Sequence, residues 1–194
     1  MKQKGSRAST AQCGFTLVEM LLVVVAVALL AAVGVPICMG TYKKMQVEKA
    51  ARNVLFAARY ARMTAIELQS PCRLVLDAQE RALGLTVHVP DEVTGRTEWV
   101  PFRDSCFKGP LEFEAGVEFE DIQIAPRGAQ YVADADDEQT ILFLPNGTAQ
   151  TALVQVGNGK TRRTVSVCAA TGRAKLYLGG AENVEIRTTD LDER

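Results

Sequence analysis

The hydrophobic and polar positions of the chain follow three successive patterns. Residues 15–39 form an almost unbroken apolar run, FTLVEMLLVVVAVALLAAVGVPICM, and the stretch 20–39 within it carries no charged residue. A helix of that length can cross a bilayer. We therefore expect residues 15–40 to form a transmembrane helix, in which Glu19 is the only charged residue.

From residue 41 the sequence becomes polar but keeps apolar residues at helical spacing. Neither Pro nor Gly interrupts it between Thr41 and Ser70, and Pro71 predicts the end of the helix. We expect residues 41–70 to continue the same helix as an amphipathic half, with its arginines mostly on the solvated side. The predicted buried face consists of Val47, Ala51, Val54, Leu55, Ala58, Ala61, Ala65 and Leu68.

Beyond residue 71 the pattern changes to short runs in which apolar and polar residues alternate, as in antiparallel strands. Turn sequences such as Pro145-Asn146-Gly147 separate these runs. The intervals 90–110 and 134–138 are predicted to be loops. The predicted strands are 73–77, 83–89, 111–113, 117–119, 122–124, 140–144, 148–156, 161–168, 173–178 and 184–187. The expected fold class is α+β, with one long N-terminal helix packed on an antiparallel sheet domain that occupies residues 71–194.

Length and charge limit the class of protein. A chain of 194 residues with 47% hydrophobic residues can bury one sizeable core. Its net charge of −1 gives no broad basic field for nucleic acid. Residues 1–14 differ, because they carry Lys2, Lys4 and Arg7 and no acid; their removal would change the net charge from −1 to −4. Basic residues ahead of the apolar run predict a cytoplasmic N-terminus and an external, periplasmic C-terminal domain.

Glu19 is the feature of the apolar run that needs an explanation. A carboxylate without a partner at such a depth costs on the order of 3 kcal/mol. A cut between Gly14 and Phe15 would create an amino group on Phe15, and the amine of a neighbouring subunit could then reach Glu19. An uncleaved signal anchor, with Glu19 extending toward the headgroups, is the alternative. A cleavable secretory signal is disfavoured, since no clear small-x-small site follows the run.

The segment Gly14-Phe15-Thr16-Leu17-Val18-Glu19, which follows a short basic leader, resembles the processing site of class III prepilins. These are the type IV pilins and the pseudopilins of type II secretion. The resemblance implies that a membrane peptidase removes the leader, residues 1–14, and N-methylates Phe15. It also implies that Glu19 neutralises an amine in a growing filament, and that Pro36 kinks the helix. The implied partners are this peptidase, the inner membrane, and other pilins or pseudopilins that contact the N-terminal helix.

Shorter segments of the remaining chain resemble the GspH/FimT family of minor pseudopilins. They are Ala57-Ala58-Arg59, Ala61-Arg62, Phe143-x-Pro145-x-Gly147, Arg163-x-Val165-x-Val167 and Gly172-Arg173. The resemblance implies a structural subunit of a type II secretion pseudopilus, which takes part in protein export across the outer membrane. FimT-like members belong instead to type IV pili, and some take part in DNA uptake. A membrane-anchored domain that never assembles is the third alternative.

The sequence does not predict an enzyme or a cofactor. Its one histidine, His88, lies on an alternating strand, and no Gly-x-Ser-x-Gly elbow accompanies it. The run Gly157-Asn158-Gly159-Lys160-Thr161 contains Gly-Lys-Thr, as a phosphate-binding loop does. Val154 stands where that loop needs its first glycine, so a hairpin turn is the better interpretation.

Acidic residues and cysteines of the predicted external domain raise the questions of metal binding and of a disulfide. Asp134, Asp136 and Glu138 alternate like calcium ligands, but Gln139 occupies the place of the required glycine, and we expect a solvated loop and no metal. Three cysteines lie in the predicted external domain, where thiols oxidise readily. One disulfide among them is expected, and the sequence does not say which two of Cys72, Cys106 and Cys168 it joins.

The predicted hairpin of 161–168 and 173–178 separates an apolar face from a basic one. Arg173, Lys175 and Ser166 are expected to share the outer face, with Lys160 and Arg162 nearby on the same hairpin. The inner face is expected to consist of Val165, Val167, Ala174, Leu176 and Leu178.

The stretch Gly172-Arg173-Ala174-Lys175 is similar to the Gly-Arg-x-Arg stretch linked with DNA binding in FimT-like pilins, with Lys in the last place. A lysine can neutralise a phosphate without the bidentate geometry of arginine. So few charges would give weak, salt-sensitive binding without sequence preference. Because the domain as a whole is acidic, an ordinary solvated strand face is the favoured interpretation.

Overall fold

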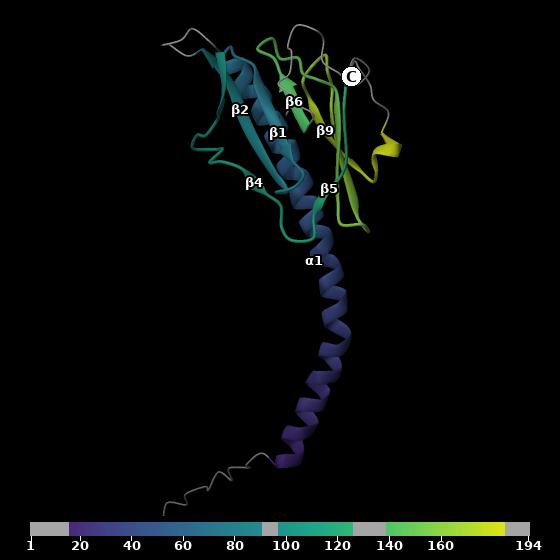
Figure 1. Cartoon of the computed structure of the whole chain (residues 1–194). Coiled ribbons are helices and arrows are strands. Elements are labelled where there is room, and N and C mark those ends of the chain that lie inside the picture. The colour runs from purple at the N-terminus through teal and green to yellow at the C-terminus, as the bar shows by residue number, and fades with distance from the viewer. Residues whose placement is uncertain (1–15, 91–96, 126–138, 185–194) are drawn as a thin grey trace, which may run out of the picture. The chain divides into compact units, whose positions relative to one another are not determined.

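The computed structural model describes residues 16–90, 97–125 and 139–184, except for the side chains of residues 33–38 and Asn183 (Figure 1). The chain divides into two compact units, with the boundary between Tyr42 and Lys43. The predicted leader 1–14, the acidic run 134–138 and nearly all of the predicted strand 184–187 lie outside the described residues.

One helix, α1 (Leu17–Glu67), crosses the boundary between the two units. It begins and ends within three residues of the predicted limits. The helix continues through Pro36, and the kink expected there stays a prediction. Over the part of the chain whose side chains are described, no helix is long and apolar enough to cross a membrane.

The amphipathic half of α1 buries the face that its periodicity predicts. Six of the eight predicted positions are buried and Leu55 is half-buried, whereas Leu68 is 50% exposed. Leu68 lies beyond the last helical residue, next to Gln69, whose φ of 50° turns the chain away. The six buried positions are Val47, Ala51, Val54, Ala58, Ala61 and Ala65.

The first sheet has the order β3-β2-β1-β6, with the short β4 also paired to β2 (Figure 1). All of its pairings are antiparallel. In the turn from β1 to β2, Asp77 Oδ1 accepts hydrogen bonds from the amides of Gln79 and Glu80 at 2.9 and 2.8 Å. The strands are β1 (Cys72–Asp77), β2 (Ala82–Pro90), β3 (Thr97–Pro101), β4 (Leu111–Glu112) and β6 (Thr140–Phe143).

Strand β3 corrects one prediction, since residues 90–110 were expected to form a loop. Its residues are mostly exposed at the edge of the sheet, so the strand lacks the apolar alternation that marks a buried one. Trp99 provides its main contact: the indole lies opposite His88 on β2, with ring centroids 4.7 Å apart. The guanidinium of Arg73 lies 3.6 Å from the centroid of the same indole.

The second sheet has the order β5-β7-β8-β9 and is also antiparallel. The two predicted runs 117–119 and 122–124 form one strand with an irregular register between Phe119 and Asp121. The predicted strand 148–156 is shorter than expected, and Ala149 forms only an isolated bridge to Phe143. The strands are β5 (Glu118–Ile124), β7 (Ala152–Gly157), β8 (Arg162–Val167) and β9 (Ala174–Leu178), and a short 3-10 helix, η2 (Ala181–Asn183), follows.

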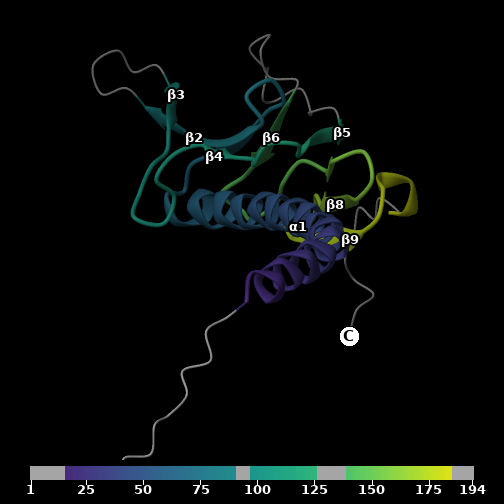
Figure 2. The same ribbon diagram turned by 90° about the horizontal axis from the view of Figure 1, so that it is seen from below.

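Within the second unit, α1 packs against both sheets at once (Figure 2). One continuous core joins Val54 and Ala61 of the helix to Leu74 of the first sheet and to Val154 and Val165 of the second. Burial of each such aliphatic side chain contributes about 1.5–3 kcal/mol. The α+β class is therefore confirmed, and the predicted single sheet is corrected to two.

The loop between β3 and β4 is anchored to α1 by a hydrogen bond between Tyr60 and Asp104. The Tyr60 hydroxyl donates a hydrogen bond to Asp104 Oδ2, and Asp104 Oδ1 accepts the amides of Cys106 and Phe107, both at 2.7 Å. The buried Phe107 ring stacks on Tyr60 with centroids 6.0 Å apart. The hydrogen bond to Asp104, together with burial, raises the pKa of Tyr60 to about 12.

Candidate functional site: the apolar half of the helix

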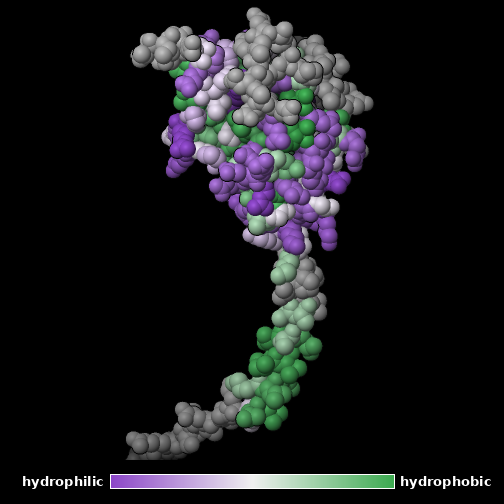
Figure 3. All heavy atoms as spheres, in the orientation of Figure 1, coloured by the Kyte–Doolittle hydropathy of each residue, from purple (hydrophilic) through white to green (hydrophobic). Residues whose placement is uncertain are grey.

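Residues 17–32 of α1 expose their apolar side chains. Leu17 is 82% exposed, Val24 66% and Leu30 75%, and nearly all large residues between them are similarly open. Figure 3 shows hydrophobic side chains along the visible face of this segment. Soluble proteins rarely leave so large an apolar surface uncovered, and a helix that is apolar all round is normally surrounded by lipid or protein. The segment is thus the strongest candidate for a functional surface.

Glu19 lies in the first turn of α1 and is exposed among these apolar residues. Among the described residues, no cation forms an ion pair with it. Its negative charge lies near the N-terminal end of the helix dipole, where a carboxylate is favoured.

Thr16 caps the start of the helix, a role that the sequence analysis missed. Its hydroxyl oxygen accepts a hydrogen bond from the Glu19 amide at 3.3 Å, and its carbonyl accepts the first helical bond from Met20 at 3.2 Å. A Thr followed three residues later by Glu is the pattern of a capping box, which could have revealed this role. Glu19 therefore has a possible role in helix initiation as well as in charge pairing.

The residues of the predicted cleavage site cannot be placed in the same way. Gly14 and Phe15 lie outside the described residues, so cleavage and N-methylation there stay predictions. Pro36 lies inside α1, twenty-one positions after Phe15 in the sequence.

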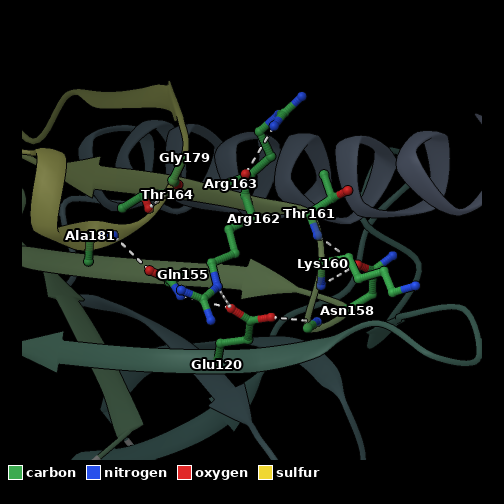
Figure 4. Close-up of polar contacts among 11 residues, drawn as sticks. Glu120, Gln155, Asn158, Lys160, Thr161, Arg162, Arg163, Thr164, Gly179 and Ala181 are labelled. Atoms are coloured by element: carbon green, nitrogen blue, oxygen red, sulfur yellow. Dashed lines mark hydrogen bonds and ion pairs between the residues drawn. The ribbon is translucent and has the colours of Figure 1, made fainter.

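The predicted basic surface on the second sheet is only partly formed (Figure 4). Arg162 Nε forms an ion pair with Glu120 Oε2 at 2.8 Å, and the Glu120 side chain is only 12% exposed. Glu120 also accepts hydrogen bonds from Gln155 Nε2 and from the amide of Gly159, both at 2.8 Å. The charge of Arg162 is thus already balanced by Glu120, which lies on another strand and which no local sequence pattern marks as its partner.

The other predicted contacts lie at opposite ends of the hairpin rather than in one group. Lys160 is in the turn before β8, and Arg173 is in the turn after it. The six residues of β8 separate them by about 20 Å. Lys175 does pair with Ser166 across the strands, as expected. The structure therefore places Arg173 and Lys175 together but does not bring Lys160 and Arg162 to them.

The inner face of this hairpin agrees with the prediction except at its end. Val165, Val167 and Ala174 are buried, and Leu176 is half-buried. Leu178, in contrast, is 76% exposed because it lies at the end of an edge strand, opposite Arg163 rather than over the core.

The expected disulfide is not formed, and Cys72, Cys106 and Cys168 are all present as thiols. Cys72 begins β1 of the first sheet, Cys168 follows β8 of the second, and Cys106 is on the exposed loop after β3. Burial raises the pKa of the Cys72 thiol to about 12, which keeps it protonated and unreactive.

His88, the one histidine of the chain, lies against an aromatic ring in the first sheet. Burial, reinforced by the charge of Arg73, lowers the pKa of His88, which packs on Trp99 within the sheet. No three ligating side chains gather as a metal site in the described ranges. The acidic run with Asp134, Asp136 and Glu138 lies outside them.

A long helix with an apolar first half, followed by antiparallel sheets packed on its second half, defines a pilin-like subunit. Residues 9–35 match the prokaryotic N-terminal methylation motif. Residues 50–172, more than half of the chain, match the family described as type II transport protein GspH. The chain therefore belongs to the GspH family and is a pilin-like structural subunit, not an enzyme.

Solved structures of two proteins align with the chain at low sequence identity. The minor pseudopilin EpsH from the type II secretion system of Vibrio cholerae aligns in two structures. Their TM-scores are 0.52 and 0.51 and their identities 15% and 12%; they cover 71% and 69% of this chain and 96% and 97% of EpsH. The type IV minor pilin FimU of Pseudomonas aeruginosa aligns with a TM-score of 0.43 and 14% identity, over 67% of this chain and 91% of FimU. No protein with a curated description matches the sequence.

Proposed function

We propose that the chain is a minor pseudopilin of a type II secretion pseudopilus and takes part in protein export across the outer membrane. The observation that carries this proposal is the apolar half of α1, in which residues 17–32 are exposed and Glu19 is the single carboxylate. In a membrane, lipid covers this surface; in a filament, the helices of neighbouring subunits cover it. The family match and the EpsH fold favour a secretion machinery.

In this proposal the chain enters the inner membrane with its N-terminus in the cytoplasm and its sheet domain in the periplasm. The prepilin peptidase then cuts between Gly14 and Phe15 and methylates the new amine. When the subunit leaves the membrane, Glu19 enters a filament core of low dielectric constant. An unpaired carboxylate there costs free energy. Pairing of Glu19 with the amine of an adjacent subunit satisfies both charges and makes assembly depend on processing.

Deletion of the gene tests the machinery to which the subunit belongs. We expect the culture supernatant of the deletion strain to lack several exported proteins that its parent secretes. The intact gene should restore them, whereas a Gly14→Ala variant, which blocks processing, should not. An unchanged supernatant would overturn the secretion proposal and favour a FimT-like minor pilin of a type IV pilus, for which transformation and motility are the assays.

The third alternative, a membrane-anchored domain that does not assemble, makes a separate prediction. In that case Gly14→Ala would leave every function of the chain intact, because no filament requires the free amine of Phe15. Crosslinking of the wild-type chain to other pseudopilins in the membrane fraction, and its loss in the Gly14→Ala chain, would exclude this alternative.

A further inference from the structure

The backbones of Lys43 and Lys160 both bond to Asn158, in the turn between β7 and β8, which contacts the first residues of the second unit. Asn158, in that turn, donates from Nδ2 to the carbonyl of Lys43 at 3.4 Å. Its Oδ1 accepts the amides of Lys160 at 3.2 Å and of Thr161 at 2.9 Å. One side chain thus holds the Lys160 turn against the helix at Lys43, and Lys44 follows directly.

Three carboxylates near this end of the unit are paired with other bases, whereas Glu118, opposite Gly157 at the same turn, forms no ion pair among the described residues. Glu48 Oε2 forms an ion pair with Arg163 at 2.8 Å, and Glu114 Oε1 forms one with Lys49 at 2.6 Å. Glu120 is occupied by Arg162, as described above. The ion pairs of the described residues include none of the exposed lysines Lys43, Lys44 and Lys160. This end of the unit therefore presents a local excess of positive charge.

The position of these lysines along the chain suggests what they meet. The uncharged stretch ends at Met39, and Lys43 follows it four residues later in the sequence. Lysines at the end of an apolar helix extend their stems along apolar surface and place the ammonium group among headgroups. Met45, next to them, is 64% exposed and adds an apolar side chain of the kind that enters such an interface.

We propose that Lys43, Lys44 and Lys160 form a basic collar that binds the anionic phospholipid headgroups of the membrane holding the apolar helix. The proposal rests on the proposed function only in requiring that this helix lie in a membrane. Two collar lysines come from the helix and the third from a hairpin turn more than a hundred residues later. Headgroup binding therefore fixes the sheet domain, as well as the helix, against the membrane surface until the subunit enters a filament.

Hydrogen exchange of the full-length chain in nanodiscs tests this collar. One preparation contains only phosphatidylcholine and the other also contains phosphatidylglycerol. Because each lysine near an anionic surface slows opening about five-fold, we expect amide exchange in residues 157–162 to slow at least that much with phosphatidylglycerol. Raised salt should remove the difference, since it screens the headgroup charge.

Two variants of equal charge separate the collar from a general charge effect. The triple change Lys43→Gln, Lys44→Gln and Lys160→Gln should abolish the lipid-dependent protection. The control Arg59→Gln, Lys108→Gln and Arg173→Gln removes three other exposed positive charges and should keep it. Equal protection in the two lipids, or protection that survives the collar variant, would overturn the proposal.

Two further measurements assign the cause of a negative result. If the chain does not co-purify with nanodiscs at all, the membrane anchor of the proposed function has failed. If the chain co-purifies but residues 157–162 exchange equally in both lipids, only the collar has failed. Protection of the same residues by a double-stranded oligonucleotide in the absence of phosphatidylglycerol protection would assign these lysines to nucleic acid and overturn the lipid proposal.

Discussion

Gly172 and Gly147 approach each other so closely that a Cβ atom on Gly172 would lie 2.4 Å from the carbonyl oxygen of Gly147. Gly147 follows the last strand of the first sheet, and Gly172 lies in the turn between β8 and β9 of the second. Both have positive φ, +82° at Gly147 and +60° at Gly172. Arg62 of α1 donates from Nε to the same Gly147 carbonyl at 3.2 Å. The helix and both sheets therefore meet at these two turns, which explains the glycines of the Pro145-x-Gly147 and Gly172-Arg173 segments.

Gly172→Ala is expected to lower the free energy of unfolding by about 2 kcal/mol or more, because it adds both backbone strain and a contact with the Gly147 carbonyl. Gly159→Ala is the matched control. Gly159 also has positive φ, +78°, but no atom lies within 4 Å of its added Cβ, so about 1 kcal/mol is expected. Urea unfolding of the full chain in detergent, followed by circular dichroism, measures both. Equal losses would contradict the close packing of the two turns.

The contact between Arg163 and Glu48 should make stability depend on acid pH. The hydrogen bond from Arg163 lowers the pKa of Glu48 from its ordinary value of 4.5, with a smaller contribution from Arg52. A lowered pKa in the folded state stabilises the protein above about pH 4.5, and this contribution disappears as the pH falls below that value. Arg163→Gln should therefore flatten the acid limb of the stability profile. Arg59→Gln is the control. Arg59 is exposed on α1, the helix that carries Glu48, and its replacement should leave the stability profile unchanged.

Tyr60 should produce the opposite dependence at alkaline pH. Its folded-state pKa of about 12 exceeds the ordinary value of 10.0, because its hydroxyl donates to Asp104 and because it is buried. A raised pKa contributes stability that is complete below pH 10 and is lost between about pH 10 and 12. Tyr60→Phe should lower stability at neutral pH and remove this alkaline loss. Tyr177→Phe is the control and should keep the alkaline loss of stability. If the loss persists in Tyr60→Phe, it does not come from the Tyr60 hydroxyl.

Substitutions at Glu19 separate its two possible roles. Glu19→Val removes both the charge and the capping side chain, and it should leave cleavage intact while reducing incorporation into filaments. Glu19→Gln keeps a side chain that suits a capping box but removes the charge. If charge pairing controls assembly, Glu19→Gln should be as defective as Glu19→Val in crosslinking to neighbouring subunits. Normal incorporation of Glu19→Gln would instead assign Glu19 to helix initiation.

The periodicity of the helix could be predicted because it depends on local spacing alone. Val47, Ala58 and Ala65 lie on one face of any helix that contains them, whatever that helix packs against. The β8–β9 hairpin could be predicted for the same reason, since a short turn sets the register of Ser166 and Lys175.

Contacts between distant segments could not be predicted in this way. Glu120 and Arg162 belong to strands that are not neighbours in the sheet, and no local pattern indicates that they meet. Strand β3 was missed because an exposed edge strand carries no apolar alternation. Leu178 was predicted to be buried because it follows the apolar alternation of β9. It is exposed because the hydrophobic core does not extend to the end of that strand.

The mass of the N-terminal peptide tests the central claim most directly. The chain would be isolated from the membrane fraction of the source bacterium and digested, and a strain without the prepilin peptidase would serve as the control. We predict a peptide that begins at Phe15 and carries one methyl group on its amine, and the unprocessed leader in the control strain. A wild-type chain that retains Met1 or Lys2 at its N-terminus would contradict its assignment as a processed pseudopilin subunit.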